Sequence, residues 1–490
     1  MQSDNNPVNR RSLCILQLST ADVGGGAEAV ALQLFQAYRD RGHASWLAVG
    51  LKRTDSDHIL VIPNDACRSI WARKWNAVGN LVSPLVGRVR GAWRLRRLLQ
   101  ITIGQPRRWI NIQRGKEDFD FPGTWQLLNI LPERPEIIHC HNLHGGWIPT
   151  RGYFDLRALP WLSQQVPVVL TLHDVWQLTG HCSYSLDCAR WKTGCGHCPD
   201  LTLYVPLPRD ATAYNWQRKQ QIYAKSRLFV ATPSKWLMDI VEQSMLMPSI
   251  VEARVIPNGV NLSFFHPGDK RAERTVLGIP QSARVVLFVA NGIKRNIWKD
   301  YHTLRNAIAL VGGHLCDQPL LLIAVGENAP AEQIGQAQIR FVPFQKDPAI
   351  LARYYRASDL YVHSARAENF PTTILEALAC ARPVVATAVG GIPEQLKGLR
   401  IGGLISRNGD WNEYEVDQAT GVLVPPADAE SMAAAMIRLL TDDVLRQRLG
   451  RNAAHDARQR FDQNAQVTAY LQWYEEIVER WKAEHSAPVQ

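Results

Sequence analysis

Short apolar runs alternate along the chain with stretches in which apolar residues recur at helical spacing. Residues 13–18 form a run of strand length, residues 27–39 have the helical pattern, and residues 44–49 form a second run. This β-α-β order predicts a parallel sheet with helices on its faces. Residues 136–140 and 166–172 are predicted to be further buried strands, and polar residues follow both at the end where such sheets bind ligands.

The same alternation restarts near residue 284, which predicts a second α/β domain. Its strand-like runs are residues 285–290, 320–325, 360–363, 383–387 and 422–424. We expect an N-terminal domain over residues 12–266, a C-terminal domain over residues 267–463, and a final helix over residues 464–490 that packs back on the N-terminal domain. The turn-rich segment 257–267 is the predicted linker.

The composition is that of a folded globular protein. Of the 490 residues, 46% are hydrophobic and 20% are charged, and these values exclude a disordered or collagen-like chain. The sequence has no run of about 20 apolar residues that could span a membrane, and residues 1–12 lack the apolar core of a secretory signal. We therefore expect a cytoplasmic protein.

The net charge of +10 is concentrated in one segment. Residues 66–116 contain no Asp or Glu, and Trp71, Trp75, Trp93 and Trp109 lie among their basic residues. Those basic residues are Arg68, Arg73, Lys74, Arg88, Arg90, Arg94, Arg96, Arg97, Arg107, Arg108, Arg114 and Lys116. We place a basic, Trp-rich insertion at about residues 66–131. Three interpretations of this insertion are open. It is a solvated face whose Trp residues pack inward, or a surface for an anionic membrane or a lipid-linked substrate. The third interpretation, a nucleic-acid surface, fits least. A membrane surface would put the protein at the inner face of the cytoplasmic membrane.

Two carboxylates with seven residues between them follow the strand that ends near residue 363. Pro371 suits the first turn of a helix, which puts Glu368 in the loop before the helix and Glu376 inside it. Free backbone N–H groups at the helix start can bind a diphosphate, and they belong to Phe370, Thr372 and Thr373. Carboxylates accept hydrogen bonds from sugar hydroxyls. A nucleotide sugar therefore fits this segment, and the alternative is two unrelated surface glutamates.

A glycine-rich turn follows the first predicted strand. Gly24, Gly26 and Ala29 fit the dinucleotide fingerprint G-x-G-x-x-A. However, residues 19–23 separate the strand from the first glycine, and no acidic residue lies near residue 49, where one would bind the ribose of NAD. The sequence therefore argues against an NAD-dependent dehydrogenase.

Four cysteines lie close together in the N-terminal half of the chain. They are Cys182, Cys188, Cys195 and Cys198. Their number matches the four positions of a tetrahedral zinc site, and such a closed site would hold a loop in place rather than catalyse. An iron–sulfur cluster and reduced or disulfide-bonded cysteines are the alternatives.

Histidines stand at the ends of two predicted strands. His173 precedes Asp174 after one strand and is either a satisfied core histidine or a site residue. His139, His141 and His144 invite a metal interpretation, but H-x-H on a strand puts two side chains on one face without fixing a third ligand. We favour the lining of an acceptor site for these three.

Together these motifs resemble the retaining glycosyltransferases of family 4. The resemblance rests on residues 24–28, the strand that leads to His173 and Asp174, residues 257–260, Lys299, residues 368–380, residues 390–394 and residues 421–428. Residues 179–199 also resemble a Cys-containing insertion in the colanic-acid-like, envelope-polysaccharide branch of this family. The resemblance implies a GT-B fold, in which two Rossmann-like domains face each other across a cleft, with this Cys-rich loop inserted in the N-terminal domain.

The resemblance also implies roles for single residues. Glu368 contacts the donor sugar, Glu376 contacts the nucleotide ribose, and Lys299 contacts the diphosphate together with Lys294 or Arg295. The implied catalytic residues are His173, Glu368 and Lys299; the implied donor-binding residues are Gly25, Gly26, Lys294, Arg295, Asn369, Phe370, Pro371, Thr372, Thr373 and Glu376; and the implied acceptor-side residues are Glu28, His141 and His144. The family usually has an Arg five residues before the lysine, where this chain has Lys294.

The expected reaction moves a sugar from a nucleotide diphosphate sugar to an acceptor hydroxyl with retention of anomeric configuration. The expected acceptor is a saccharide or a lipid-linked saccharide of a cell-envelope or extracellular polysaccharide, and no catalytic metal is expected. Two other functions stay open at this point. One is a nucleotide-sugar epimerase or hydrolase of the same fold, and the other is a zinc-stapled nucleic-acid-binding protein, which would leave Glu368 and Glu376 without a purpose.

Overall fold

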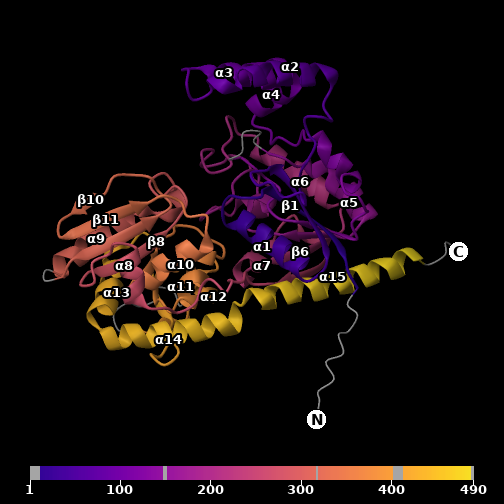
Figure 1. Cartoon of the computed structure of the whole chain (residues 1–490). Helices are drawn as coiled ribbons and strands as arrows, with labels where there is room; N and C mark the ends of the chain where they lie inside the picture. The colour runs from indigo at the N-terminus through magenta and orange to yellow at the C-terminus, as the bar shows by residue number, and fades with distance from the viewer. Residues whose placement is uncertain (1–10, 147–151, 316–317, 401–411, 487–490) are drawn as a thin grey trace, which may run out of the picture. The chain divides into compact units, whose positions relative to one another are not determined.

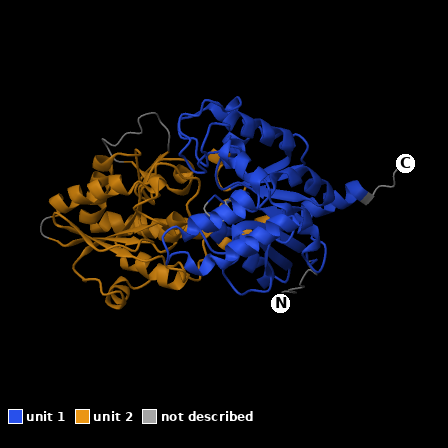
Figure 2. Ribbon diagram, turned by 90° about the horizontal axis from the view of Figure 1, so that it is seen from above, with its two compact units in different colours: residues 1–232, 238–254, 471–490 blue, residues 233–237, 255–470 orange. Residues whose placement is uncertain are grey.

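The computed structural model describes residues 11–146, 152–315, 318–400 and 412–486, which form two compact units. Unit 1 contains the described residues of 1–232, 238–254 and 471–490, and unit 2 contains those of 233–237 and 255–470 (Figure 2). Each unit has a largely parallel sheet with helices beside it, so the predicted pair of α/β domains is confirmed (Figure 1). Among the helices described, none combines the length and the apolar character that crossing a bilayer requires.

Unit 1 is built on a seven-stranded sheet with the order β3-β2-β1-β4-β5-β6-β7. The strands are β1 (Cys14–Ala21), β2 (Ala44–Leu51), β3 (Ile59–Val61), β4 (Ile137–Cys140), β5 (Val168–Thr171), β6 (Leu228–Thr232) and β7 (Ile250–Val255). The pairs from β3 to β6 are parallel. Strands β2 and β3 extend the sheet on one side of β1, and β4 extends it on the other. The chain therefore switches direction between β1 and β4, and ligands of such sheets bind at the carboxyl ends of strands at this point.

Unit 2 repeats this arrangement in a nine-stranded sheet with the order β10-β11-β9-β8-β12-β13-β16-β14-β15. The strands are β8 (Arg284–Val289), β9 (Leu320–Val325), β10 (Glu332–Ile334), β11 (Ala337–Val342), β12 (Leu360–His363), β13 (Val384–Thr387), β14 (Gly398–Leu399), β15 (Glu413–Tyr414) and β16 (Gly421–Val424). The edge pair β10–β11 is antiparallel, whereas β8 pairs in parallel with both β9 and β12. The switch point of this sheet lies between β8 and β12.

Helices bury both faces of the sheets. They are α1 (Gly26–Asp40), α5 (Leu159–Gln165), α6 (Thr212–Tyr223), α7 (Lys235–Val241), α8 (Lys270–Val276), α9 (Tyr301–His314), α10 (Pro348–Ala357), α11 (Thr372–Ala379), α12 (Ile392–Gln395), α13 (Ala429–Thr441) and α14 (Asp443–Arg460). In β8, Val285 and Leu287 belong to one hydrophobic cluster and Val286 and Phe288 to another. Because side chains alternate along a strand, the two clusters lie on opposite faces of the sheet, which explains the continuous apolar run in the sequence.

The basic segment forms a helical insertion between β3 and β4. Its helices are α2 (Ile70–Leu81), α3 (Ala92–Arg97), a π-helical turn η2 (Leu98–Ile103) and α4 (Pro106–Gln113). Trp71 and Trp93 are each 56% exposed. The interpretation in which this segment packs its Trp residues inward is therefore wrong for these two.

The last helix, α15 (Gln463–Ser486), begins in unit 2 and continues into unit 1. Within unit 1, the hydroxyl of Tyr474 lies 2.6 Å from Nδ1 of His139 in β4 and 3.2 Å from the hydroxyl of Tyr38 in α1. Trp473 donates from Nε1 to Oε1 of Glu252 in β7. Buried polar contacts thus fix the second part of α15 to the unit 1 sheet.

Candidate functional site

Lys299 and Glu368 meet at the switch point of unit 2. Lys299 ends η8 (Ile297–Lys299) in the loop after β8, and Glu368 lies in the loop after β12. The Lys299 ammonium forms an ion pair with Oε1 of Glu368, and both side chains are less than one-fifth exposed. Burial lowers the pKa of Lys299 to about 8, while the adjacent carboxylate favours the charged ammonium. The structure therefore brings together two of the three predicted catalytic residues.

Several bonds fasten the Lys299 loop to the Glu368 loop. Arg366 donates from its backbone N–H to the carbonyl of Trp298 (2.8 Å) and from Nε to Oδ2 of Asp300 (3.0 Å). Ser364 donates from its hydroxyl to the carbonyl of Lys299 (2.8 Å). Asp300 itself has a left-handed backbone, with φ 42°, and caps the start of α9. This network sets where the Lys299 ammonium lies, and the sequence motifs gave no sign of Arg366 or Asp300.

His363, the last residue of β12, lies close to the ion pair. Its side chain is fully buried, and its Nδ1 lies 3.0 Å from the hydroxyl of Tyr361. Its Nε2 lies 3.7 Å from Oε1 of Glu368 and has no hydrogen-bond partner among the described residues. Burial, together with the nearby charge of Lys299, holds the pKa of His363 well below its usual range, so the ring is neutral. The signal that could have revealed His363 is its place at the carboxyl end of a strand at the switch point.

Two glycines shape the backbone at Glu368. Gly390 has φ +58°, and a Cβ built on it would lie 1.7 Å from the carbonyl oxygen of Glu368. Gly391 donates from its N–H to the carbonyl of Asn369 (2.9 Å), and the Asn369 side chain lies 2.6 Å from the hydroxyl of Ser234. Only glycine fits at position 390, because any side chain would push the Glu368 loop away.

The diphosphate-binding expectation falls on the start of α11. Pro371, with φ −65°, is the N-cap residue, and the helix begins at Thr372. Pro371 therefore precedes the first turn, in which it was predicted to lie. The N–H groups of Thr372 and Thr373 are in the first turn, where helices have no internal acceptors for them. The carbonyl of Phe370, just before the helix, accepts a hydrogen bond from the Asn258 side chain at 3.2 Å.

Glu376 lies one turn inside α11. The hydroxyl of Tyr355 in α10 donates to Oε2 of Glu376 at 2.8 Å and also contacts the carbonyl of Thr373 at 3.2 Å. Burial raises the pKa of Glu376 to about 7, although the Tyr355 hydrogen bond favours the ionised form. A carboxyl with such a pKa can gain or lose its proton near neutrality when a ligand arrives.

The two basic candidates that precede Lys299 differ in their contacts. Lys294 lies 2.5 Å from Oε1 of Glu332 and over the ring of Phe341, at 4.4 Å from its centroid. Arg295 is exposed, and no carboxylate of the described residues lies within 4.0 Å of it. Lys294 is therefore already held at the β10–β11 edge, whereas Arg295 has its charge available.

His141 and His173 form a second polar group, in unit 1. Nδ1 of His141 lies 3.0 Å from Nε2 of His173, and Nε2 of His141 lies 3.0 Å from Oε1 of Gln17. Burial lowers the pKa of His173 to about 4 and that of His141 well below its usual range, so both rings are neutral at neutral pH. With the Gln17 oxygen as acceptor, His141 carries its proton on Nε2 and accepts from Nε2–H of His173. The hydrogen bond between the two histidines thus connects the residues that follow β4 and β5.

The other two histidines of unit 1 have different surroundings. His144 lies 2.7 Å from Oδ2 of Asp174, whose Oδ1 accepts from the N–H of Trp176. His139 is fully buried between Thr171 (2.7 Å) and Tyr474 and is a satisfied core histidine.

Glu28 faces the glycine-rich turn. Its Oε2 accepts a hydrogen bond from the N–H of Gly25 at 2.8 Å, which caps the start of α1. A Cβ on Gly24 would lie 3.0 Å from Cγ of Glu28, whereas one on Gly26 would meet open space. Glu28, which was predicted to lie on the acceptor side, is 95% buried. Its carboxylate is directed at the glycine-rich turn that precedes α1.

The zinc interpretation of the four cysteines stays a prediction. In the part of the chain that the structure describes, no three His, Cys, Asp or Glu side chains are placed so that they could hold a metal ion. Cys182, Cys188, Cys195 and Cys198 are free thiols, and burial raises the pKa of Cys182 to about 12 and that of Cys195 to about 11. The Sγ of Cys198 lies 3.3 Å from Nε2 of His181.

Lys219 of α6 holds the Cys-rich loop from within unit 1. Its buried ammonium lies 2.9 Å from Oε1 of Glu117 and donates to the carbonyls of Trp176 (2.8 Å) and Thr179 (3.0 Å). It also lies over the Trp176 ring, 3.6 Å from the centroid. The loop after β5 is therefore fixed from within by a cation, a contact that sequence analysis missed.

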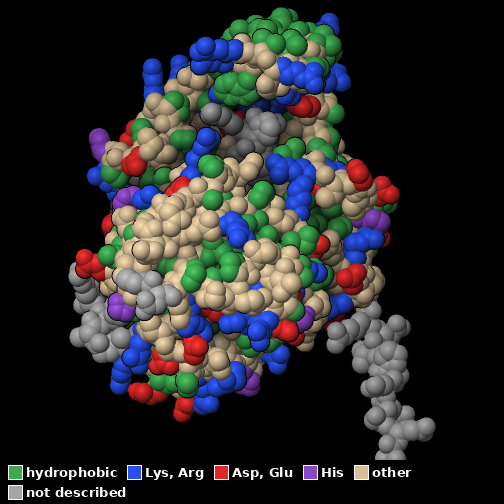
Figure 3. Space-filling model, turned by 60° about the vertical axis from the view of Figure 1, so that its left-hand side comes forward, with side chains coloured by type: hydrophobic (Ala, Val, Ile, Leu, Met, Phe, Trp, Pro, Cys, Tyr) green, Lys and Arg blue, Asp and Glu red, His purple; other side chains and the backbone are tan. Residues whose placement is uncertain are grey.

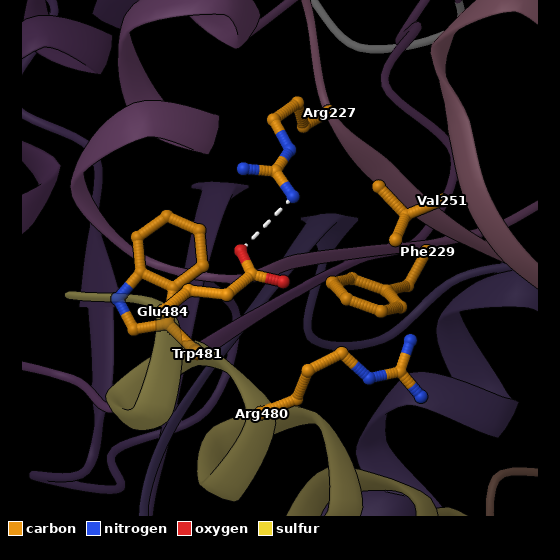
Figure 4. Close-up of a pocket in the computed structure, with 6 residues that line it drawn as sticks. All are labelled: Arg227, Phe229, Val251, Arg480, Trp481 and Glu484. Carbon is orange, nitrogen blue, oxygen red and sulfur yellow. Dashed lines mark hydrogen bonds and ion pairs between the residues drawn. The ribbon is translucent and has the colours of Figure 1, made fainter. Parts of the chain in front are cut away.

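A small pocket near the end of α15 contains none of the predicted site residues. Six residues line it: Arg227, Phe229, Val251, Arg480, Trp481 and Glu484 (Figure 4). Arg227 and Glu484 form an ion pair across it at 3.0 Å. Its volume of about 10 Å³ holds at most one water molecule, so it is no ligand site.

Two family models match most of the chain. Residues 24–264 match the model described as Glycosyltransferase Family 4, and residues 283–442 match the one described as Glycosyl transferases group 1. A putative colanic acid biosynthesis glycosyl transferase, WcaC of Escherichia coli, is 25% identical over 52% of this chain and 60% of its own length. The chain thus spans less than two thirds of that relative. D-inositol 3-phosphate glycosyltransferase of Corynebacterium jeikeium is 28% identical over 65% of this chain and 71% of its own length.

Solved structures share the fold over nearly the whole chain. Sucrose-phosphate synthase of Thermosynechococcus elongatus covers 95% of this chain and matches over 99% of its own, with a TM-score of 0.57 and 19% identity. Anabaena HepE in complex with UDP covers 94% of this chain and matches over 99% of its own, with a TM-score of 0.56 and 16% identity. These likenesses confirm the GT-B architecture predicted from the sequence.

Proposed function

The chain belongs to the glycosyltransferases, with a family 4 domain followed by a group 1 domain, and on this premise we propose that it transfers a sugar from a nucleotide diphosphate sugar to an acceptor hydroxyl with retention of configuration. The observation that carries the proposal is the ion pair of Lys299 and Glu368 at the switch point of unit 2. The start of α11 and the carboxyl of Glu376 follow within eight residues.

Each part of the donor has a matching group in unit 2. Glu376 accepts from the ribose hydroxyls, the N–H groups of Thr372 and Thr373 bind the diphosphate, and Glu368 accepts from the hydroxyls of the transferred sugar. Arg295 joins Lys299 at the diphosphate, because Lys294 is engaged by Glu332. The solved complexes of HepE with UDP and UDP-glucose support a nucleotide sugar as the class of donor.

The reaction needs charge stabilisation more than it needs a nucleophile. The bond between the anomeric carbon and the diphosphate oxygen breaks, and its electron pair goes to the diphosphate. The acceptor oxygen bonds to the same face of that carbon, and its proton passes to the departing diphosphate. Lys299, charged at neutral pH, exchanges its partner Glu368 for the diphosphate and stabilises the developing charge. The family resemblance implies that His173, whose burial lowers its pKa to about 4 and keeps its ring neutral, faces the transferred sugar.

The acceptor is a saccharide or a lipid-linked saccharide of an envelope or extracellular polysaccharide. The name of the Escherichia coli relative, putative colanic acid biosynthesis glycosyl transferase, supports this class. The proposed setting is the cytoplasmic face of a membrane. A nucleotide-sugar epimerase or hydrolase would use the same donor residues but would need no acceptor.

Thermal unfolding with UDP, GDP, ADP, CMP and NAD tests the donor site. A ligand at about 100 times its Kd stabilises the folded protein by about 2.7 kcal/mol, and we expect one nucleoside diphosphate to do so. Lys299→Ala and Glu376→Ala should abolish the rise. An absence of any rise, or a rise with NAD alone, would contradict the proposal. Incubation of the selected nucleotide sugar without acceptor distinguishes the enzymes, because an epimerase or hydrolase would consume it.

A further inference from the structure

The helical insertion of unit 1 has an unusual surface. Among the described residues, 26 large hydrophobic side chains are exposed, and eleven of them lie within residues 70–110. They are Ile70, Trp71, Val78, Leu81, Leu85, Val89, Trp93, Leu95, Leu98, Trp109 and Ile110. Figure 3 shows hydrophobic side chains gathered on the part of the molecule that α2, α3 and α4 form, with Lys and Arg side chains beside them. We call this the insertion surface.

The exposed apolar side chains of the insertion surface lie on a regular, capped helix and do not result from poor packing. On α2, Ile70, Trp71, Val78 and Leu81 fall within about 100° of the helix circumference, and Ile70 and Leu81 are 66% and 79% exposed. The helix is capped by Ser69, whose hydroxyl accepts from the N–H of Ala72. An ordered helix that turns one apolar face to the outside has a face that awaits a partner.

Most basic side chains of the insertion are also unpaired. Arg68 is paired with Asp120 and buried Arg108 with Asp118, so these two belong to the structure of the unit. Arg73, Lys74, Arg88, Arg90, Arg94, Arg107 and Arg114 are exposed, and no described carboxylate lies within 4.0 Å of them. Seven uncompensated positive charges thus lie in the same 45 residues as the eleven exposed apolar side chains.

We propose that the insertion surface docks on an anionic lipid bilayer, with its apolar side chains in the headgroup and upper acyl region and its arginines on lipid phosphates. A bilayer surface offers both an apolar layer and negative charge, and Trp and Arg on amphipathic helices suit that boundary. Nucleic acid would pair the arginines but leave the apolar side chains in water. A second copy of this chain would cover the apolar side chains but bring two sets of uncompensated arginines together.

Co-sedimentation with vesicles tests this surface in the full-length protein. The probes are vesicles of neutral phosphatidylcholine, and vesicles in which about one third of the lipid is anionic phosphatidylglycerol. We expect binding to the anionic vesicles that weakens between 0.05 and about 0.5 M salt, because the screening length shortens. The triple variant Arg88→Ser/Arg90→Ser/Arg94→Ser should lower the partition coefficient about 100-fold, and Ile70→Ser/Leu81→Ser/Trp93→Ser should lower it at least about 10-fold.

Matched controls are available on unit 2. Val276, Leu310 and Val444 are 62%, 48% and 80% exposed, and Arg271, Arg451 and Arg458 are exposed as well. Changing either set to Ser should leave vesicle binding unchanged. Equal binding to both vesicle types, no binding, or equal losses in control and insertion variants would overturn the proposal. So would preferential binding to a 20-nucleotide DNA, or a dimer that the apolar variant dissociates.

The outcome is independent of the donor site. The insertion variants should keep the wild-type rise in Tm with the selected nucleotide, because none of their residues belongs to unit 2. A protein that binds anionic vesicles but no nucleotide would support the docking surface and contradict the proposed function. A protein that binds a nucleotide but no vesicles would support the proposed function and contradict the docking surface.

Discussion

The hydroxyl of Tyr355 lies 2.8 Å from Oε2 of Glu376, at the inner side of the helix that follows the Glu368 loop. Tyr355 is fully buried and cannot ionise near neutrality, because burial raises its pKa well above its usual range. It therefore donates its proton to Glu376 in every state of that carboxyl. The bond orients Glu376 and leaves its other oxygen for a ligand, while burial still keeps the pKa near 7.

Nucleotide binding should therefore be coupled to proton release from Glu376. Ribose hydroxyls donate to the ionised carboxylate and lower its pKa, so affinity rises as the pH increases toward 7 and is constant above it. Calorimetry in two buffers of different ionisation enthalpy measures the protons released. We expect release of a proton near pH 6 that is lost in Glu376→Gln. Affinity that does not change between pH 5.5 and 8 would contradict the ribose role.

The same carboxyl should destabilise the folded protein at high pH. Its pKa is about 7 in the folded protein, against 4.5 for an ordinary glutamate. The cost is therefore absent below about pH 4.5, grows as the pH rises, and is complete above about pH 7 at about 3 kcal/mol. Glu376→Gln should raise the free energy of unfolding at pH 8 although it weakens nucleotide binding. Urea denaturation at pH 5 and pH 8 measures both values. A variant less stable than the wild type at pH 8 would show that Glu376 serves the fold instead.

Lys299 should set the alkaline limit of activity. Its ammonium loses its proton above about pH 8 in the free protein, so kcat/KM should fall there, whereas a bound diphosphate raises that pKa and moves the fall in kcat to higher pH. Lys299→Ala should lower kcat by about 10² to 10³ and remove this limb of the pH profile. Arg295→Ala should cost less, and Lys294→Ala should change stability more than turnover. Wild-type turnover in purified Lys299→Ala would contradict the assignment.

Gly390 should tolerate no side chain. A Cβ there would lie 1.7 Å from the carbonyl of Glu368, whereas Gly278, with a similar φ of +60°, has nothing within 4 Å of such an atom. Gly278→Ala isolates the cost of left-handed backbone, about 1 to 2 kcal/mol. Gly390→Ala should cost clearly more and should also abolish the nucleotide-dependent rise in Tm, because the Glu368 loop must move. Equal costs in the two variants would show that the loop yields freely.

Lys219 should be required for the loop after β5. Removal of its ammonium in Lys219→Ala leaves Glu117 buried without a counter-charge, which costs about 3 to 5 kcal/mol. The double variant Lys219→Met/Glu117→Gln removes both charges and should recover part of that loss. Exposed Lys225→Ala, just after the end of α6, is the control. Stability is measured by urea denaturation, and a neutral Lys219→Ala would show that the cation is not what fixes the loop.

The sequence predicted those parts of the fold that repeat along the chain. Strands β9 and β12 begin and end at the predicted residues, because each is an apolar run with both faces buried. The edge strands β10 and β15 were not predicted, since Glu332–Ile334 and Glu413–Tyr414 are short and mixed in character. In these edges pairing depends on the neighbouring strand rather than on the strand's own pattern.

The candidate site was predictable where one sequence motif contains the residues that act together. It was not predictable where the fold brings together residues that are distant in sequence. Glu368 and Glu376 could be placed by their spacing on a loop and a helix. Tyr355 and Arg366 could not be found, because their contacts come from strand order and loop packing. The four cysteines show the opposite case, in which close spacing in sequence did not produce converging side chains. Residues 401–411 carry no predicted site residue and lie outside the described part of the chain.

His363 should position Glu368 for the transferred sugar. Its neutral, fully buried ring lies 3.7 Å from the Glu368 carboxylate and is held by Tyr361. When the donor draws Lys299 away from Glu368, the Nε2 of His363 can donate to the carboxylate and keep its direction. His363→Ala should therefore weaken the nucleotide sugar about 10-fold relative to the nucleoside diphosphate, whereas a purely structural role would weaken both alike. His363→Gln, which keeps an N–H donor, should restore part of the difference, and exposed His455→Ala should change neither affinity. Calorimetric titration of both ligands gives the ratio, and a ratio unchanged in His363→Ala would exclude the positioning role.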